Sequence, residues 1–306
     1  MPFLIATEPG RVDRPNEDFA AVTARCAVVL DGVSGPLDGD GGCSHGVAWY
    51  VRRLGALLLA GADTGRPLRS ALAEAITATT ALHAGTCDTA HRDTPSATVA
   101  AVRMTGEGLE YLVLSDSVLL VADPRPVARA GKALRADGRH GAPHPAGRPT
   151  GDGRPAGRPT VADAPNVGDP VAVDGVGLVA DTRLDALRAD LLRRGEPAGA
   201  IRALRGVPGG FWTAGSDPRA ADEALTGTAA AGPFALMTDG ATRAVEVFGD
   251  LDWGQAFSLV SDKGPRALIE RVRALEAADP EGGSHPRGKV RDDATVVFWE
   301  PEALVR

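Results

Sequence analysis

The chain contains few aromatic, cysteine or histidine residues. Of its 306 residues, 4% are aromatic, three are cysteine and six are histidine, whereas apolar residues make up 43%. The apolar share is large enough for a sizeable core in one large domain or two small ones, and that core must rest on Val, Leu and Ala. The histidines form no HExxH-like group, so a catalytic zinc site has little support.

Cysteine is too scarce to form a disulfide framework. The three cysteines are Cys26, Cys43 and Cys87. An odd number without a secretory leader is typical of the reducing cytoplasm, and we predict a cytoplasmic location. Cys26 lies in an apolar run and is interpreted as a core thiol. No two cysteines form a CxxC pair, so their spacing does not predict a structural zinc site.

The chain also has no long hydrophobic run and no excess of basic residues. No uninterrupted apolar stretch reaches the roughly 18 residues of a membrane span, and the N-terminal residues 1–5 have no basic flank typical of a secretory signal. The formal net charge is −7, which argues against nucleic acid or an anionic membrane as the main partner. The sequence does not indicate the oligomeric state.

Apolar periodicity predicts strands near both ends of the chain and helices in between. Strands are expected within 2–35 and at 96–104, 109–114, 117–122, 234–238 and 294–299. Helices are expected at 44–61, 67–84, 181–205, 219–226 and 264–278. This order lacks the regular βα alternation of a doubly wound sheet and favours an α+β fold of antiparallel sheets with helices packed outside.

Residues 138–170 differ in composition from the rest of the chain. Gly and Pro dominate, and the sequence Ala-Gly-Arg-Pro-Thr occurs twice, at 146–150 and 156–160. Such a segment cannot bury enough apolar surface to offset its ordering entropy. We interpret it as a flexible insertion within one domain, either a tolerated surface loop or a substrate lid.

Three aspartates stand where strand-like apolar runs begin or end: Asp31, Asp239 and Asp292. Taken singly, an Asp-Gly pair is first of all a turn, and Asp292 could be a solvated charge. Carboxylates from three distant segments converge at a sheet rim only on a cation, because like charges repel. In a two-metal site such carboxylates hold a water that loses its proton easily, which suits the hydrolysis of inert phosphate monoesters.

Six short motifs containing these residues follow one another in a fixed order. They are Asn16-Glu-Asp18, Asp31-Gly-Val-Ser-Gly35, Ser96-Ala-Thr98, Leu114-Ser-Asp-Ser117, Leu236-Met-Thr-Asp-Gly240 and Asp292-Asp-Ala-Thr295. Together they resemble the metal-dependent serine/threonine phosphatase family of type 2C, bacterial branch, over nearly the full chain.

The resemblance implies a four-layer α-β-β-α sandwich of two antiparallel sheets, with residues 1–306 forming a single catalytic domain. It implies two Mn²⁺ or Mg²⁺ ions, with Asp31 bridging both and the Gly32 carbonyl, Asp239 and Asp292 completing the ligand set. Glu17 and Asp18 would hold metal-bound waters. Asp116, together with Asp239, would contribute to a third, weaker metal position.

Two departures from the family pattern concern the phosphate and the proton donor. The position of the family's phosphate-binding Arg is Asp13 here, so we assign that role to Arg14, with Arg11 as the alternative. Val33 stands where many members carry a His, and no general acid is carried over; His45 is interpreted as a surface residue at a helix start.

The predicted function is hydrolysis of phosphoserine or phosphothreonine in proteins by a metal-activated water. A phosphatase of the same fold acting on a small phosphorylated metabolite is an alternative, because the chain departs from the family after Asp116. A catalytically silent regulatory or binding module is a third possibility, against which the presence of all three metal-binding aspartates argues.

Overall fold

The computed structural model describes residues 2–33, 41–122 and 168–301. These residues form two sheets in which every strand pair is antiparallel. The six-stranded sheet has the order β1 (Leu4–Glu8), β11 (Ala294–Trp299), β10 (Phe234–Met237), β6 (Val118–Val121), β8 (Val176–Ala180) and β7 (Val171–Val173). The five-stranded sheet has the order β2 (Phe19–Val22), β3 (Cys26–Val33), β4 (Ser96–Thr105), β5 (Gly108–Leu114) and β9 (Leu225–Ala229).

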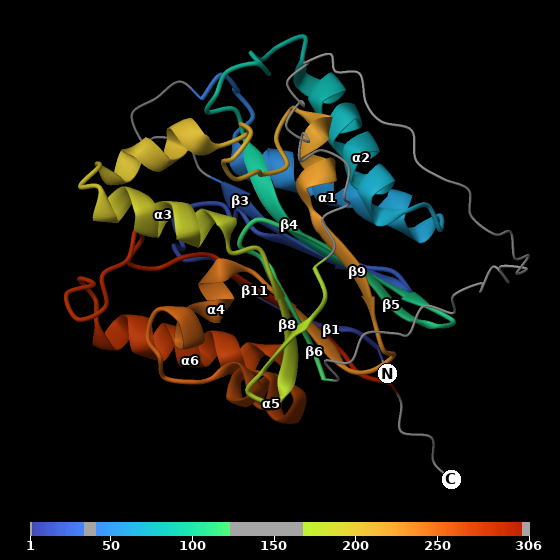
Figure 1. Ribbon diagram of the computed structural model, residues 1–306, viewed down its shortest axis with the longest axis vertical. Helices are drawn as coiled ribbons and strands as arrows, with labels where there is room; N and C mark the ends of the chain where they lie inside the picture. The colour runs from blue at the N-terminus through green and yellow to red at the C-terminus, as the bar shows by residue number, and fades with distance from the viewer. Residues whose placement is uncertain (1, 34–40, 123–167, 302–306) are drawn as a thin grey trace, which may run out of the picture.

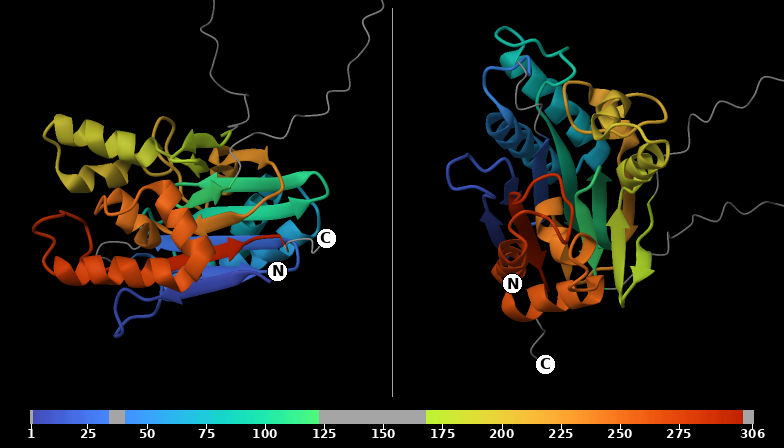
Figure 2. Two further views of the ribbon diagram at one scale, coloured as in Figure 1. Left: turned by 90° about the horizontal axis from the view of Figure 1, so that it is seen from below. Right: turned by 90° about the vertical axis from the view of Figure 1, so that its left-hand side faces the viewer.

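Helices cover the outer face of each sheet (Figures 1 and 2). The five-stranded sheet is covered by α1 (Val47–Asp63) and α2 (Leu68–His83). The six-stranded sheet is covered by α4 (Asp239–Glu246), α5 (Trp253–Lys263) and α6 (Pro265–Ala278). The remaining helical segments are α3 (Arg183–Arg193) and two 3₁₀ helices, η1 (Ala198–Leu204) and η2 (Pro218–Glu223). The layer order is therefore helix, sheet, sheet, helix, which confirms the predicted α-β-β-α sandwich.

Strand β3 shows how the sequence builds these layers. Its residues are buried on both faces of the sheet, as the continuous apolar run requires. Val28 and Leu30 pack in the cluster beneath α1 and α2, whereas Ala27 and Val29 pack between the two sheets. This alternation is the period of two that every strand imposes on its side chains.

Most of the predicted elements are confirmed, and two are revised. The element predicted at 181–205 divides into α3 and η1, because Gly195 ends α3 in a left-handed conformation (φ 71°) and Pro197 has no N–H to continue the helix. The helix predicted at 219–226 is the shorter η2, and strand β9 follows it directly. The proposed insertion at 138–170 lies almost wholly outside the described residues; within it, the Gly168 N–H donates to the Thr226 carbonyl (3.3 Å). Among the described helices, none is long and apolar enough to cross a membrane.

Candidate active site

Four of the predicted aspartates line one cleft of about 700 Å³: Asp31, Asp116, Asp239 and Asp292. Asp31 lies near the end of β3, opposite Thr98 of β4, and Asp116 follows β5. Asp239 opens α4 directly after β10, and Asp292 precedes β11. Both sheets therefore deliver carboxylates to the same rim, as the positions at strand ends predict.

Two glycines let the backbone segments of the cleft approach closely. A Cβ on Gly32 would lie 2.4 Å from Cγ1 of Val47 and 2.7 Å from the Glu17 carbonyl oxygen. A Cβ on Gly240 would lie 1.8 Å from the Asp293 carbonyl oxygen. No side chain fits at either position, so the glycine that follows each aspartate is required by packing and not only by a turn.

The carboxylates are close enough to oppose one another's ionisation. The pKa of Asp31 is raised well above its ordinary value, first by burial and then by the charges of Asp239, Asp18, Asp292 and Asp116. The pKa of Asp239 is likewise raised, by burial first and then by Asp292 and Asp116. A divalent cation bound among these carboxylates would stabilise their ionised form.

Two buried carboxylate oxygens have no hydrogen-bond donor in the described chain and could bind such a cation. Oδ1 of Asp239 and Oδ1 of Asp18 are buried, and neither accepts a hydrogen bond from the described chain. Oδ2 of Asp18 accepts from the Thr238 hydroxyl at 2.9 Å. Unsatisfied carboxylate oxygens, together with the Gly32 backbone, form the all-oxygen donor set that Mg²⁺ and Mn²⁺ prefer. The residues present therefore fit the predicted metals.

Glu17 and Asp18 lie beside the cleft lining. The Glu17 N–H donates to Oδ2 of Asp293 (2.6 Å), and the Gly10 N–H donates to Oδ1 of the same residue (2.7 Å). Asp293, which had no predicted role, thus holds the segment carrying Glu17 and Asp18 against the segment carrying Asp292. The double aspartate was visible in the sequence, but the partner amides were not.

Asp292 is held by cations that the sequence did not identify. Arg243 Nη2 donates to its Oδ2 (2.9 Å), and Lys289 Nζ donates to its Oδ1 (2.6 Å). Arg243 is buried and also pairs with Glu276 (2.7 Å), whose second carboxylate oxygen accepts from Arg273 (2.7 Å). This network orients Asp292. Of its contacts, only the pair with Lys289 could have been inferred from the sequence, because Lys289 stands three residues before Asp292.

Asp116 stands in a strained turn. Ser115, which precedes it, has φ of 65°, a left-handed conformation that a non-glycine residue rarely adopts. The Ser115 N–H donates to Oδ2 of the buried Asp181 (3.2 Å), which is itself paired with Arg183 (2.8 Å). The hydrogen bond to Asp181 therefore fixes a conformation that carries backbone strain.

The assignment of Arg14 as the phosphate-binding residue stays a prediction. Arg14 is exposed and is not among the described residues that line the cleft, and Arg11 is paired with Asp13 at 2.6 Å. The cations that do line the cleft are Arg188, Arg202, Arg205, Arg243, Arg287 and Lys289. Of these, Arg188 is exposed and acts on the pKa of Asp116, which burial raises and Arg188 lowers.

The metal-free protein is expected to lose stability as the pH rises from about 5.5 to about 8. The pKa of Asp18 is raised from 3.8 to about 7, first by burial, so the folded state binds more protons than the unfolded state in this range. Stability therefore falls through the folded-state pKa and levels off above it. We expect Tm of chelator-treated protein to drop by about 5 °C, and Asp18→Asn to flatten this dependence. A Tm that rises with pH would contradict the electrostatic account.

Comparison with solved structures shows the fold. No protein-family model matches the chain, and no curated protein matches its sequence. The serine/threonine phosphatase PstP/Ppp of Mycobacterium tuberculosis is similar with a TM-score of 0.54 and 15% identity, over 99% of both chains. A bacterial serine phosphatase gives 0.55 and 13%, over 99% of this chain and 98% of that one. Stp1 of Staphylococcus aureus gives 0.53 and 12%, over 98% and 95%. These structures confirm the predicted fold.

Proposed function

We propose that the protein is a metal-dependent phosphomonoester hydrolase that removes phosphate from phosphoserine and phosphothreonine in proteins. The observation that carries the proposal is the convergence of Asp31, Asp116, Asp239 and Asp292 on one cleft, where their charges act on one another. The likeness in fold to bacterial enzymes named serine or serine/threonine phosphatases supports the same activity and a protein substrate. The whole chain acts as one catalytic domain in this proposal.

The cleft residues would hold two Mn²⁺ or Mg²⁺ ions. Asp31 would serve both ions, and the Gly32 carbonyl, Asp239 and Asp292 would complete the ligand set. Glu17 and Asp18 would orient metal-bound waters, and Asp116 with Asp239 would contribute to a third, weaker metal position. When bound, these cations activate a water and neutralise the phosphoryl oxygens. Arg243 and Lys289 keep Asp292 in place, and the exposed Arg188 presents a cation to an entering phosphate.

A cytoplasmic location is part of this proposal. It rests on the small, odd number of cysteines, which is typical of proteins in a reducing compartment, where disulfides are rare.

The function is tested by hydrolysis of p-nitrophenyl phosphate with and without Mn²⁺ or Mg²⁺. Turnover that requires the metal and disappears in EDTA is the expected result. Undiminished activity in EDTA would overturn the metal assignment, and no activity with either metal would identify a silent binding module. Phosphopeptides compared with a panel of phosphorylated metabolites then separate the protein substrate from the small-molecule alternative.

Two arginines can be compared for the phosphate-binding role. If Arg14 binds phosphate, Arg14→Ala is expected to raise KM by about 10-fold with little change in kcat, since the lost hydrogen bonds to a charged group contribute about 1.5–3 kcal/mol. Arg188→Ala is the matched variant on the cleft wall. A raised KM in Arg188→Ala alone would move the role to α3, and normal kinetics in both variants would exclude both residues.

A further inference from the structure

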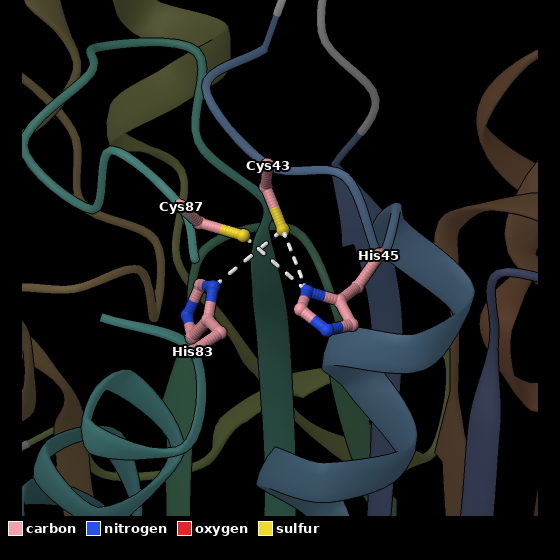
Figure 3. Close-up of side chains that lie close together, drawn as sticks. All are labelled: Cys43, His45, His83 and Cys87. Atoms are coloured by element: carbon pink, nitrogen blue, oxygen red, sulfur yellow. Dashed lines mark hydrogen bonds between the residues drawn. The ribbon is translucent and has the colours of Figure 1, made fainter. Parts of the chain in front are cut away.

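Two cysteines and two histidines outside the cleft converge on one point (Figure 3). They are Cys43, His45, His83 and Cys87, and one potential ligand atom from each lies within 4.8 Å of those of the other three. Three sulfur–nitrogen contacts hold the cluster together. Sγ of Cys43 lies 3.5 Å from Nδ1 of His83 and 3.8 Å from Nδ1 of His45, and Sγ of Cys87 lies 3.3 Å from Nδ1 of His45.

These separations match the edges of a tetrahedron around zinc. With Zn–S of about 2.3 Å and Zn–N of about 2.0–2.1 Å, tetrahedral angles place S and N about 3.5–3.6 Å apart. The observed S–N distances lie within a few tenths of an ångström of that value. Two thiolates and two imidazoles in tetrahedral order are the donor set of structural zinc sites.

The backbone already brings the four ligands together. His83 is the last residue of α2, and the Cys87 N–H donates to the His83 carbonyl (2.9 Å), so these two residues stand one helical turn apart on the same side. Cys43 and His45 directly precede α1. The Asp88 N–H donates to the Gly42 carbonyl (2.7 Å) and joins this segment to the one that follows Cys87.

The histidine rings are fixed by aromatic packing. The ring of His45 stacks on Trp49 at a centroid distance of 4.3 Å and an interplanar angle of 27°. His83 is 2% exposed, and its ring meets the edges of Trp49 and Tyr50 at 5.4 and 6.1 Å. Rings that are held in this way present Nδ1 to the cluster with little loss of freedom on binding.

Polar groups around one sulfur favour its ionised form. Sγ of Cys87 lies 3.6 Å from the Thr86 hydroxyl and 3.7 Å from the Ser44 hydroxyl. Hydroxyl groups beside a thiolate provide the surrounding hydrogen bonds that orient and tune metal ligands. A disulfide between Cys43 and Cys87 would leave both histidines without the partners that now face them.

We propose that Cys43, His45, His83 and Cys87 bind one structural Zn²⁺ that ties the start of α1 to the end of α2. The sequence spacing did not predict this site, because neither half contains a CxxC pair: one half is Cys-x-His and the other is His-x₃-Cys. Only the antiparallel pairing of α1 with α2 brings the halves together. Asp93, six residues after Cys87, lines the cleft, so the ion fixes a segment that leads to the candidate active site.

The test is metal binding to the reduced full-length chain. Metal-free protein is titrated with Co²⁺, which reports tetrahedral thiolate ligation by visible ligand-field bands and a near-ultraviolet sulfur-to-metal band. We expect one equivalent to give these bands and Zn²⁺ to displace it. The proposal would be overturned if the wild-type protein gave no sulfur-to-metal band. It would also be overturned if Cys43 and Cys87 formed a disulfide again after reduction, even with Co²⁺ or Zn²⁺ present.

Variants locate the ion. Cys87→Ser and His45→Asn are expected to weaken Zn²⁺ binding by at least about 100-fold, since even residues behind the ligands affect affinity by about 10–100-fold. His45 is exposed, so its replacement does not disturb the core. Cys26→Ala removes a thiol elsewhere and Asp239→Asn removes a carboxylate of the cleft; both should retain the cobalt spectrum. Bands that survive in Cys87→Ser, or that vanish in Asp239→Asn, would place the ion elsewhere.

Discussion

Replacing Asp239 with Asn is expected to reduce metal-dependent turnover by more than about 100-fold while leaving the fold intact. In the proposed site Asp239 would ligate one cation and would also contribute, with Asp116, to the weaker metal position. The change removes one negative charge and adds no volume. Because loss of residues that merely orient metal ligands costs about 10–100-fold, loss of a ligand should cost more. Initial rates with p-nitrophenyl phosphate across a Mn²⁺ titration measure the effect.

Asp239→Asn is also expected to affect the stability of the metal-free protein, which should not fall although the rate does. The pKa of Asp239 is raised by burial and by its acidic neighbours, so its charge destabilises the metal-free protein at neutral pH. Tm of metal-free Asp239→Asn should therefore equal or exceed that of the wild type. Asp222→Asn is the matched control, an exposed carboxylate outside the cleft lining. Wild-type rates in Asp239→Asn would refute the assignment. A fall in rate accompanied by a fall in Tm would also refute it, because the lost activity would then reflect unfolding.

Replacing Glu276 with Gln is expected to destabilise the protein by about 3–5 kcal/mol. Glu276 is 1% exposed, and its two carboxylate oxygens accept from Arg243 and Arg273. The amide of Gln keeps one acceptor and turns a donor toward an arginine, so a buried guanidinium loses its balancing charge. Denaturant and thermal unfolding of metal-free protein measure the loss, with a fall in Tm on the order of 10 °C.

This substitution should also weaken cation binding at the cleft. Without Glu276, Arg243 has only Asp292 as its carboxylate partner among its described ion pairs and holds that ligand more firmly. We expect the Mn²⁺ concentration for half-maximal rate to rise by about 10-fold. Glu270→Gln is the control, because Glu270 is an exposed carboxylate on the same helix. A Tm for Glu276→Gln close to that of Glu270→Gln would show that the buried network contributes little.

The sequence predicted the parts of the site that lie at strand ends. Asp31, Asp239 and Asp292 each border an apolar run, and a strand that stops at a carboxylate carries it to the rim of a sheet. The network behind them could not be predicted in this way. Arg243 and Glu276 stand on two helices and look like ordinary charged positions, and only the packing of α4 against α6 shows that they meet in the interior.

The same limit applies to the cluster of Cys43, His45, His83 and Cys87, which the sequence spacing does not reveal. Zinc-binding patterns are recognised from close spacing along the chain, whereas here each half-site contains one cysteine and one histidine, and α1 and α2 lie between them in the sequence. Strand β9 was missed for a related reason. Its residues, Leu-Thr-Gly-Thr-Ala, form a weak strand pattern. The backbone hydrogen bonds to β5 stabilise it as a strand.

Strand β11 lies between β1 and β10, and Asp293 just before it binds the amides of Gly10 and Glu17. A ribosome that makes the chain from its N-terminus therefore releases β1 long before the strand that will flank it exists. Until residues near 293 emerge, the six-stranded sheet has a gap beside its first strand and the acidic cluster lacks one wall. We therefore expect the six-stranded sheet to close only late in synthesis, with the edges of β1 and β10 unpaired until then.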